Sequence, residues 1–166
     1  PGHWPDADML PLGHIGIRAE RGQPRMSRLT RDEQHTLMTL RSVARSPLMF
    51  GGNLPDNDDF TLSLLTNGEV LAVNQHAVSS RQLFARGNQV AWVAEMPRSK
   101  ARYLAVFNTG DAGEVVAVQW SELGLPAKCV LRDLWGRQDI GAVEGGHGFK
   151  LAPHASMFLE VSPAPR

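Results

Sequence analysis

The sequence predicts an α/β segment over residues 1–75 followed by an antiparallel β-sandwich over residues 76–166. Three observations support this division. The first half contains apolar residues at helical spacing after a capping signal. The second half contains short apolar stretches, separated by turn residues at intervals of about 8–15 residues, which are typical of sandwiches and small barrels. The periodicity changes near residue 76, and no internal repeat or low-complexity linker is present.

The composition is that of a globular protein and excludes several classes of function. The 166 residues are 42% apolar and 20% charged, with 16 glycines, which argues against disorder. Seventeen basic and seventeen acidic side chains cancel, so we expect neither a nucleic-acid partner nor an anionic membrane surface. No apolar run approaches the ~20 residues that cross a bilayer. The single cysteine, Cys129, excludes an internal disulfide framework and a multi-cysteine zinc site, and its apolar neighbours predict a buried, inert thiol.

The first half predicts two helices and one short strand. Thr30 and Glu33 form a capping box that opens the first helix, and Pro47 ends it. One apolar stripe follows at helical spacing, formed by Leu37, Met38, Leu40, Arg41, Val43 and Ala44, and we expect this chain to cover it only in part. Residues 48–52 (LMFGG) predict a short buried strand closed by glycines, and Asp58 or Asp59 caps a second helix over residues 60–65. Asn67-Gly68 stops that helix. His35 is predicted to face solvent, and residues 56–59 (DNDD) to form a loop and cap rather than a calcium site.

The second half predicts six strands. They cover residues 90–95, 102–108, 114–120, 129–135, 147–151 and 156–161. Residues 108–110 (NTG) and 145–146 (GG) are interpreted as hairpin turns. Trp92, Trp120 and Trp135 are expected in the sandwich core; by alternation, Trp92 shares a face with Val90 and Ala94. The alternative is a sugar-stacking platform, which requires two rings exposed side by side.

The densest chemistry lies in residues 2–10 (GHWPDADML), and three interpretations compete. A metal site could use His3, Asp6 and Asp8, although their spacing matches no strong template. A structural loop could use the carboxylates to cap backbone amides. A sugar pocket could use aromatic and apolar side chains against the pyranose face, with carboxylates accepting hydroxyl protons, because small-ligand sites combine apolar walls with a few placed polar groups.

Residues 4–10 (WPDADML) resemble the Trp-x-Asp-x-Asp-Met-Leu signature of glycoside hydrolase family 27, the α-galactosidase and α-N-acetylgalactosaminidase family. The resemblance continues in order along the chain. It includes residues 13–16 (GHIG), 46–52 (SPLMFGG), 71–75 (LAVNQ), 130–135 (VLRDLW) and 153–156 (PHAS).

The resemblance implies that residues 1–75 are the last strands and helices of a (β/α)₈ barrel, whose active site lies at the C-terminal ends of its strands. It implies that Asp8 binds sugar hydroxyls, that Met9 lines the pocket, and that Trp4 and Asp6 support the loop, with a weaker role in substrate binding. The family is retaining, and retention requires two carboxylates about 5–5.5 Å apart. Both are expected on earlier barrel strands, so no residue of this chain is expected to be catalytic. The chain also begins with Pro1 rather than Met, which suggests a processed or excised piece.

The expected partners follow from the same resemblance. The whole protein is expected to be a retaining glycosidase for α-linked galactosides or a related glycan, and this segment alone to be inactive. Residues 1–75 cannot close a barrel, so we expect them to pack across the sandwich, against the remainder of the barrel, or against another copy of the chain. No cofactor and no metal are expected, and the resemblance suggests a secreted or periplasmic protein. The alternative is a non-catalytic carbohydrate-binding or structural sandwich module.

Overall fold

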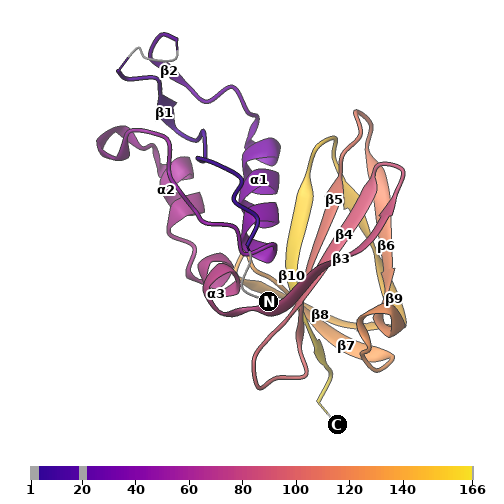
Figure 1. The fold of residues 1–166 in the computed structure, drawn as a ribbon. Coiled ribbons are helices and arrows are strands. Elements are labelled where there is room, and N and C mark those ends of the chain that lie inside the picture. Colours follow the sequence, from indigo (N-terminus) through magenta and orange to yellow (C-terminus); the bar gives the residue numbers. More distant parts are fainter. Residues whose placement is uncertain (1–3, 19–21, 166) are drawn as a thin grey trace.

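The computed structural model describes residues 4–18 and 22–165, which lie mostly in antiparallel β-sheets accompanied by a few helices (Figure 1). The N-terminal elements are β1 (His14–Ile15), β2 (Arg25–Met26), α1 (Arg31–Val43), the 3₁₀ turn η1 (Leu54–Asp56), α2 (Asp59–Leu65) and α3 (Gly68–His76). The C-terminal elements are β3 (Val78–Arg86), β4 (Gln89–Glu95), β5 (Arg102–Asn108), β6 (Glu114–Gln119), η2 (Trp120–Leu123), β7 (Lys128–Asp133), β8 (Gln138–Glu144), β9 (Gly146–Leu151) and β10 (Ser156–Pro163).

Strands β3 to β10 form the predicted β-sandwich. Six of them make one antiparallel sheet in the order β3-β4-β5-β10-β7-β8, and the β6-β9 pair covers one of its faces. The apolar side chains of both sheets meet between them; Trp120, Phe149 and Leu104 are fully buried there. Cys129 is buried in the same cluster, as predicted, and burial raises the pKa of its thiol.

Two strands and two turns differ from the sequence prediction. Strands β3 and β8 were not predicted, because they are edge strands with mostly exposed residues and lack a clean apolar alternation. The predicted hairpins at residues 108–110 and 145–146 are wrong, since each of these segments carries the chain from one sheet to the other. At the second crossing, Gly145 has a φ of 79°, and its N–H donates to the carbonyl of Ala127 at 2.7 Å.

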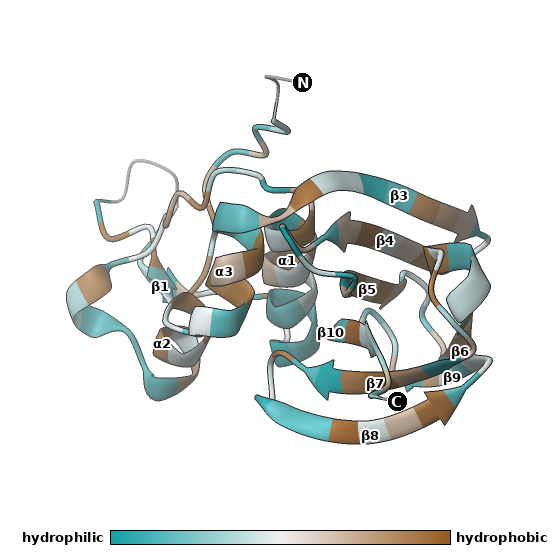
Figure 2. Cartoon of the chain, turned by 90° about the horizontal axis from the view of Figure 1, so that it is seen from below, coloured by the Kyte–Doolittle hydropathy of each residue, from teal (hydrophilic) through white to brown (hydrophobic). Residues whose placement is uncertain are grey.

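The other face of the six-stranded sheet is covered by α1 and α3 (Figure 2). Val43 from α1 and Val73 from α3 are fully buried there beside Phe158 from β10. Both faces of the central strands are therefore covered. Strand β5 accordingly has six consecutive buried residues rather than an alternating pattern.

The three tryptophans of the C-terminal part are packed on two different faces. Trp120 lies in the sandwich core, whereas Trp92 and Trp135 are half-buried against the helices. Trp92 does share its face with Val90 and Ala94, as alternation predicted, but the expectation that all three rings fill the sandwich core was wrong. None of the three forms an exposed pair, so the sugar-stacking platform lacks support.

The predicted helix caps are largely confirmed. Thr30 Oγ1 accepts from the N–H of Glu33 at 3.2 Å, and Glu33 Oε2 accepts from the N–H of Thr30 at 2.7 Å. Asp58 caps α2 by accepting from the N–H of Thr61 at 2.8 Å. The apolar stripe of α1 is only partly covered by this chain, as expected, because Leu40 is 40% exposed. The predicted strand over residues 48–52 is reduced to a single bridge at Phe50.

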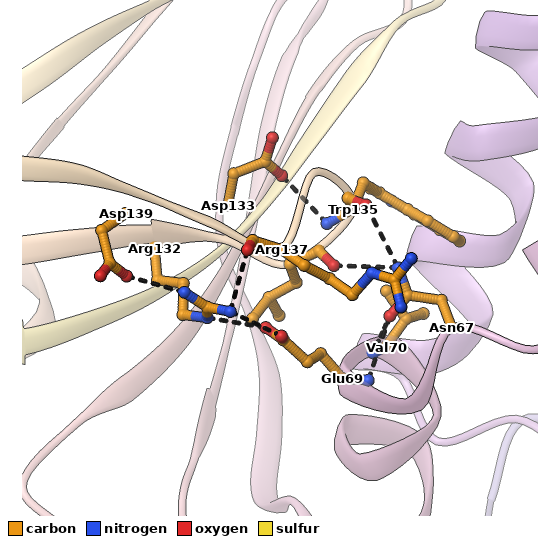
Figure 3. A network of polar contacts seen from close by, with 9 residues as sticks. Asn67, Glu69, Val70, Arg132, Asp133, Trp135, Arg137 and Asp139 are labelled. Carbon is orange, nitrogen blue, oxygen red and sulfur yellow. Dashed lines mark hydrogen bonds and ion pairs between the residues drawn. The ribbon is translucent and has the colours of Figure 1, made fainter. Parts of the chain in front are cut away.

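Asn67 does not simply stop a helix, as predicted; it starts α3 and ties it to the sandwich (Figure 3). Its Oδ1 accepts from the N–H groups of Glu69 and Val70 at 3.0 and 3.2 Å. Its Nδ2 donates to the carbonyls of Leu134 and Trp135 at 2.9 and 3.3 Å. Asn67 is buried, so these bonds satisfy polar groups that water cannot reach.

An ion-pair network lies beside Asn67 (Figure 3). The Arg132 guanidinium on β7 donates to both carboxylate oxygens of Glu69 on α3, at 2.8 and 2.9 Å, and to Asp139 on β8 at 2.8 Å. These two carboxylates raise the pKa of Arg132, with the Glu69 hydrogen bonds as the larger cause. The bidentate geometry fixes α3 relative to the β7–β8 hairpin.

His35 is not the solvated residue that the sequence predicted. Its ring stacks on Trp135 with centroids 4.7 Å apart and meets the edge of Phe60 at 5.4 Å. Burial between these rings lowers the pKa of His35. Helix periodicity placed the side chain away from the α1 stripe, but α2 and the β7–β8 turn cover that side.

A second polar link joins the N-terminus of α1 to the sandwich at His154. Its Nδ1 lies 3.1 Å from Glu33 Oε1, and its Nε2 lies 2.9 Å from Asp111 Oδ1. Thr36 Oγ1 donates to the His154 carbonyl at 2.7 Å. The hydrogen bond with Glu33, followed by that with Asp111, raises the pKa of His154, because both carboxylates favour the imidazolium.

This pair of contacts predicts a pH-dependent stability. The folded-state pKa of His154 exceeds its unfolded value, so its stabilisation is complete below the ordinary histidine pKa and is lost as pH rises through the folded value. We expect the melting-temperature difference between wild type and H154Q to be largest near pH 6 and to shrink towards pH 9. The control H76Q removes an exposed imidazole at the end of α3. A pH-independent difference for H154Q would contradict the prediction.

Candidate functional site

The site begins where two segments far apart in the sequence run side by side. Leu10 and Phe50 form a parallel bridge: the N–H of Leu10 donates to the Met49 carbonyl at 2.6 Å, and the N–H of Gly51 to the Leu10 carbonyl at 2.9 Å. A Cβ on Gly52 would lie 2.3 Å from the carbonyl oxygen of Leu12, so the close approach of the two segments requires glycine there.

A cavity of about 760 Å³ is lined mostly by residues that follow Leu10 and Phe50 along the chain. Its walls come from the β1–β2 hairpin, from residues 50–55 and from Met9. The apolar lining consists of Met9, Pro11, Ile15, Ile17, Phe50, Leu54 and Pro55, and the polar lining of His14, Arg18, Arg25 and Asn53. Apolar walls with a few polar groups are the general construction of a small-ligand site.

Of the predicted site residues, Met9 lines this cavity, and Trp4, Asp6 and Asp8 lie outside its lining. All four are exposed; Trp4 is 55% and Met9 58% exposed. A Cβ on Gly51 would lie 3.1 Å from the Cβ of Met9, which shows how closely the two segments approach beside the cavity. His3, the imidazole of the metal interpretation, lies outside the described residues. Within the described ranges, no group of three or more His, Cys, Asp and Glu is arranged to hold a metal ion.

Asp8 has a backbone conformation that few residues adopt. Its φ is 65°, in the left-handed region, where aspartate and asparagine are the most common non-glycine residues. Its carboxylate Oδ1 accepts from the N–H of Met9 at 2.6 Å. One carboxylate oxygen is thus used within the loop, and the exposed side chain leaves the other available to a ligand.

The backbone of this loop accepts hydrogen bonds from Arg41 of α1. Its Nη1 donates to the carbonyl of Asp8, and its Nη2 to the carbonyls of Ala7 at 2.5 Å and Met9 at 3.2 Å. Arg41 is only 5% exposed. Burial lowers the pKa of Arg41, while the nearby carboxylates of Asp8 and Asp6 act in the opposite direction. The residue spacing placed Arg41 in the apolar stripe of α1, and nothing in the sequence indicated a role at the site.

Other contacts fix the ends of the site. Trp4 lies over the guanidinium of Arg45, 5.8 Å from the ring centroid, and Arg45 donates to the carbonyls of Asn74 and Gln75 on α3 at 3.1 and 3.3 Å. At the rim of the cavity, His14 Nδ1 lies 2.9 Å from Asp56 Oδ2.

The pKa of Asp56 is lowered at this rim, chiefly by a hydrogen bond from Asn53 and then by His14. Residues 56–59 therefore act as the loop and cap that the sequence predicted, with Asp56 holding the rim and Asp58 capping α2.

No helix in the described part of the chain is long and apolar enough to cross a membrane.

Comparison with known proteins gives a consistent family assignment. Residues 86–161 match the family described as alpha galactosidase C-terminal beta sandwich domain. The chain is 30% identical over 160 residues to alpha-galactosidase 2 of Arabidopsis thaliana, covering 93% of this chain and 37% of that protein.

Solved structures extend the similarity over nearly the whole fold. A GH27 β-L-arabinopyranosidase from Geobacillus stearothermophilus is 48% identical, with a TM-score of 0.93 over 98% of this chain and 38% of its own. Alpha-galactosidase I from Mortierella vinacea, at 20% identity and a TM-score of 0.78, shares the fold over 98% of this chain and 40% of its own. The chain therefore spans less than half the length of the relatives it matches.

Proposed function

Because the chain corresponds to the C-terminal part of glycoside hydrolase family 27 proteins, with the alpha galactosidase C-terminal beta sandwich domain over residues 86–161, we propose that it is part of a retaining glycosidase. The substrate class is an α-linked galactoside or a stereochemically related pyranoside, such as a β-L-arabinopyranoside. In this proposal, residues 1–75 complete a (β/α)₈ barrel, and residues 76–166 form the sandwich that supports it.

The cavity lined mostly by residues that follow the Leu10–Phe50 bridge is the observation that carries this proposal. Ligands of (β/α)₈ barrels bind at the C-terminal ends of parallel strands, and most of the cavity lining follows Leu10 and Phe50 along the chain. Met9, which lies in the segment that resembles the family signature, also lines the cavity. Asp8 would accept hydrogen bonds from sugar hydroxyls beside it, and Met9 would contact the apolar face of the ring. Trp4 and Asp6 would support the loop from its outer end.

The distribution of exposed apolar side chains supports a missing barrel wall. Among the described residues, eight of the eleven exposed large hydrophobics precede residue 76: Trp4, Met9, Ile17, Met26, Leu40, Met49, Leu54 and Leu62. In this proposal, these side chains contact the rest of the barrel, because large exposed apolar patches mark interaction sites. The remainder of the barrel is the proposed partner for this surface, since α1 and α3 already use their other sides on the sandwich.

This proposal assigns the nucleophile and the acid/base to barrel strands that precede Trp4 in the full-length protein. We therefore expect a purified chain of these 166 residues to leave a chromogenic α-galactoside and a β-L-arabinopyranoside intact, because two appropriately spaced carboxylates are required for retention. The full-length protein should cleave at least one of them with retention of anomeric configuration, measured by NMR of the first-formed sugar. Cleavage by the 166-residue chain, or inversion by the full-length protein, would contradict the proposal.

A further inference from the structure

We propose that Arg41 is a positioning residue: its buried guanidinium holds the backbone of residues 7–9 so that Asp8 and Met9 present their side chains to the sugar. This inference rests on the proposed function for its substrate, but the hydrogen bonds that carry it belong to the chain alone. Three consecutive carbonyls, those of Ala7, Asp8 and Met9, accept from one guanidinium.

The loop needs such support because it forms no regular structure of its own. Residues 4–9 lie in neither a helix nor a strand, and their side chains are exposed. The first regular backbone pairing of this segment is the bridge at Leu10. The left-handed conformation of Asp8 turns the chain, so three successive carbonyls would otherwise depend on water for hydrogen bonds.

An arginine suits this task better than any other side chain. Its guanidinium carries five N–H donors in a planar fork and no acceptor, so it can serve several carbonyls at once. A lysine ammonium is a single point charge on a flexible stem and cannot reproduce that geometry. A buried cation is costly unless it is hydrogen-bonded, so the carbonyls and the guanidinium stabilise one another.

The backbone of α1 at Arg41 is held in place by buried contacts on both sides. Arg41 lies between Thr39 and Val43, both fully buried, and Val43 packs on the six-stranded sheet. The Arg41 carbonyl accepts from Asn74 Nδ2 of α3 at 3.3 Å, and the same Nδ2 donates to the Ser46 carbonyl at 2.8 Å. The position of the sugar-facing loop is therefore set by a helix that is attached to the sandwich.

The test compares R41M, R41K and the matched control R132M in the full-length protein. R132M also removes a guanidinium that joins two elements, but it lies in the α3–β7 network rather than at the loop. If Arg41 positions the loop, R41M should lower kcat/KM by about 100-fold, mainly through KM, because misplacement by about 1 Å can have this effect. R41K should recover only a small part of the lost kcat/KM. R132M should lower the melting temperature without raising KM.

A double-mutant cycle with D8N separates positioning from folding. Since Arg41 is proposed to act through Asp8 and Met9, the effect of R41M on KM should be several-fold smaller in the D8N background. Hydrogen exchange gives a readout without substrate: the amides of Met9 and Leu10 should exchange at least about tenfold faster in R41M, while the β10 amides remain protected.

Additive effects of R41M and D8N, an equal KM increase in R132M, or unchanged exchange at Met9 and Leu10 would each overturn the positioning role. If R41M does not fold, R41K, which keeps the charge, is judged by the same criteria. If wild type cleaves neither glycoside, the proposed function fails, and exchange alone decides whether Arg41 holds the loop.

Discussion

Replacing Trp135 with alanine should lower the free energy of unfolding by about 3 kcal/mol, because truncating a packed tryptophan removes apolar contacts and leaves a cavity. Trp135 joins three parts of the fold. Its ring packs against the buried residues between the helices and the six-stranded sheet, and against a second buried cluster that includes Leu10 and Met38. It also stacks on His35, and its Nε1 donates to Thr39 Oγ1 of α1 at 2.8 Å. Its carbonyl also accepts from Asn67 at 3.3 Å.

The measurement is equilibrium unfolding in urea, followed by a probe of helices and a probe of the sandwich. W135F retains most of the ring but lacks the hydrogen bond to Thr39, so it should recover more than half of the loss. The matched control is W4A, which removes an indole that is 55% exposed and should change stability by less than about 0.5 kcal/mol. A W135A variant as stable as W4A would show that the helices do not depend on this contact.

Changing Asp8 to asparagine in the full-length protein should lower kcat/KM by about 10- to 100-fold with little change in melting temperature. A hydrogen bond to a charged group contributes about 1.5–3 kcal/mol, which corresponds to this range. Asparagine preserves the local structure, since it tolerates the left-handed φ of 65°, and its Oδ1 can still accept from the N–H of Met9.

The comparison with D6N makes this experiment specific. Asp6 is also exposed in the same loop, but no hydrogen bond ties it to Met9, and its proposed role is to support the loop. D8N should therefore reduce kcat/KM several-fold more than D6N on both an α-galactoside and a β-L-arabinopyranoside. Equal effects, or an unchanged D8N enzyme, would remove Asp8 from the sugar-binding role.

Local signals predicted the parts of the fold that depend on neighbouring residues. The capping box at Thr30 and Glu33 and the cap at Asp58 need only a few adjacent residues, and both are present. The strands with strong apolar alternation or dense apolar content, such as β5 and β6, also agree with the prediction. Helix α3 was missed because Asn67-Gly68 signals a helix end as readily as a helix start.

The predicted site was only partly specified by its signature. The sequence predicted that residues 4–10 form part of the site, but it did not predict which residue hydrogen-bonds to their backbone. Arg41 follows them by more than thirty residues and sits within an apolar helical stripe, so nothing local separates a buried, hydrogen-bonded arginine from a solvent-facing one. His35 was misplaced for a related reason, because its partners Phe60 and Trp135 belong to other elements.

The sequence by itself determined the β-sandwich, the capped helices and the resemblance of residues 4–10 to a family signature, since these depend on short-range patterns of side-chain size, polarity and backbone preference. Only the tertiary structure decided which face each tryptophan packs against and which residue holds the loop at Asp8. It also decided that the glycine segments link two sheets. The physical reason is the same for all three features. Side chains are buried, and polar groups find hydrogen-bond partners, through contacts between segments that are distant in sequence. One local residue pattern is compatible with several of these contacts until the chain packs.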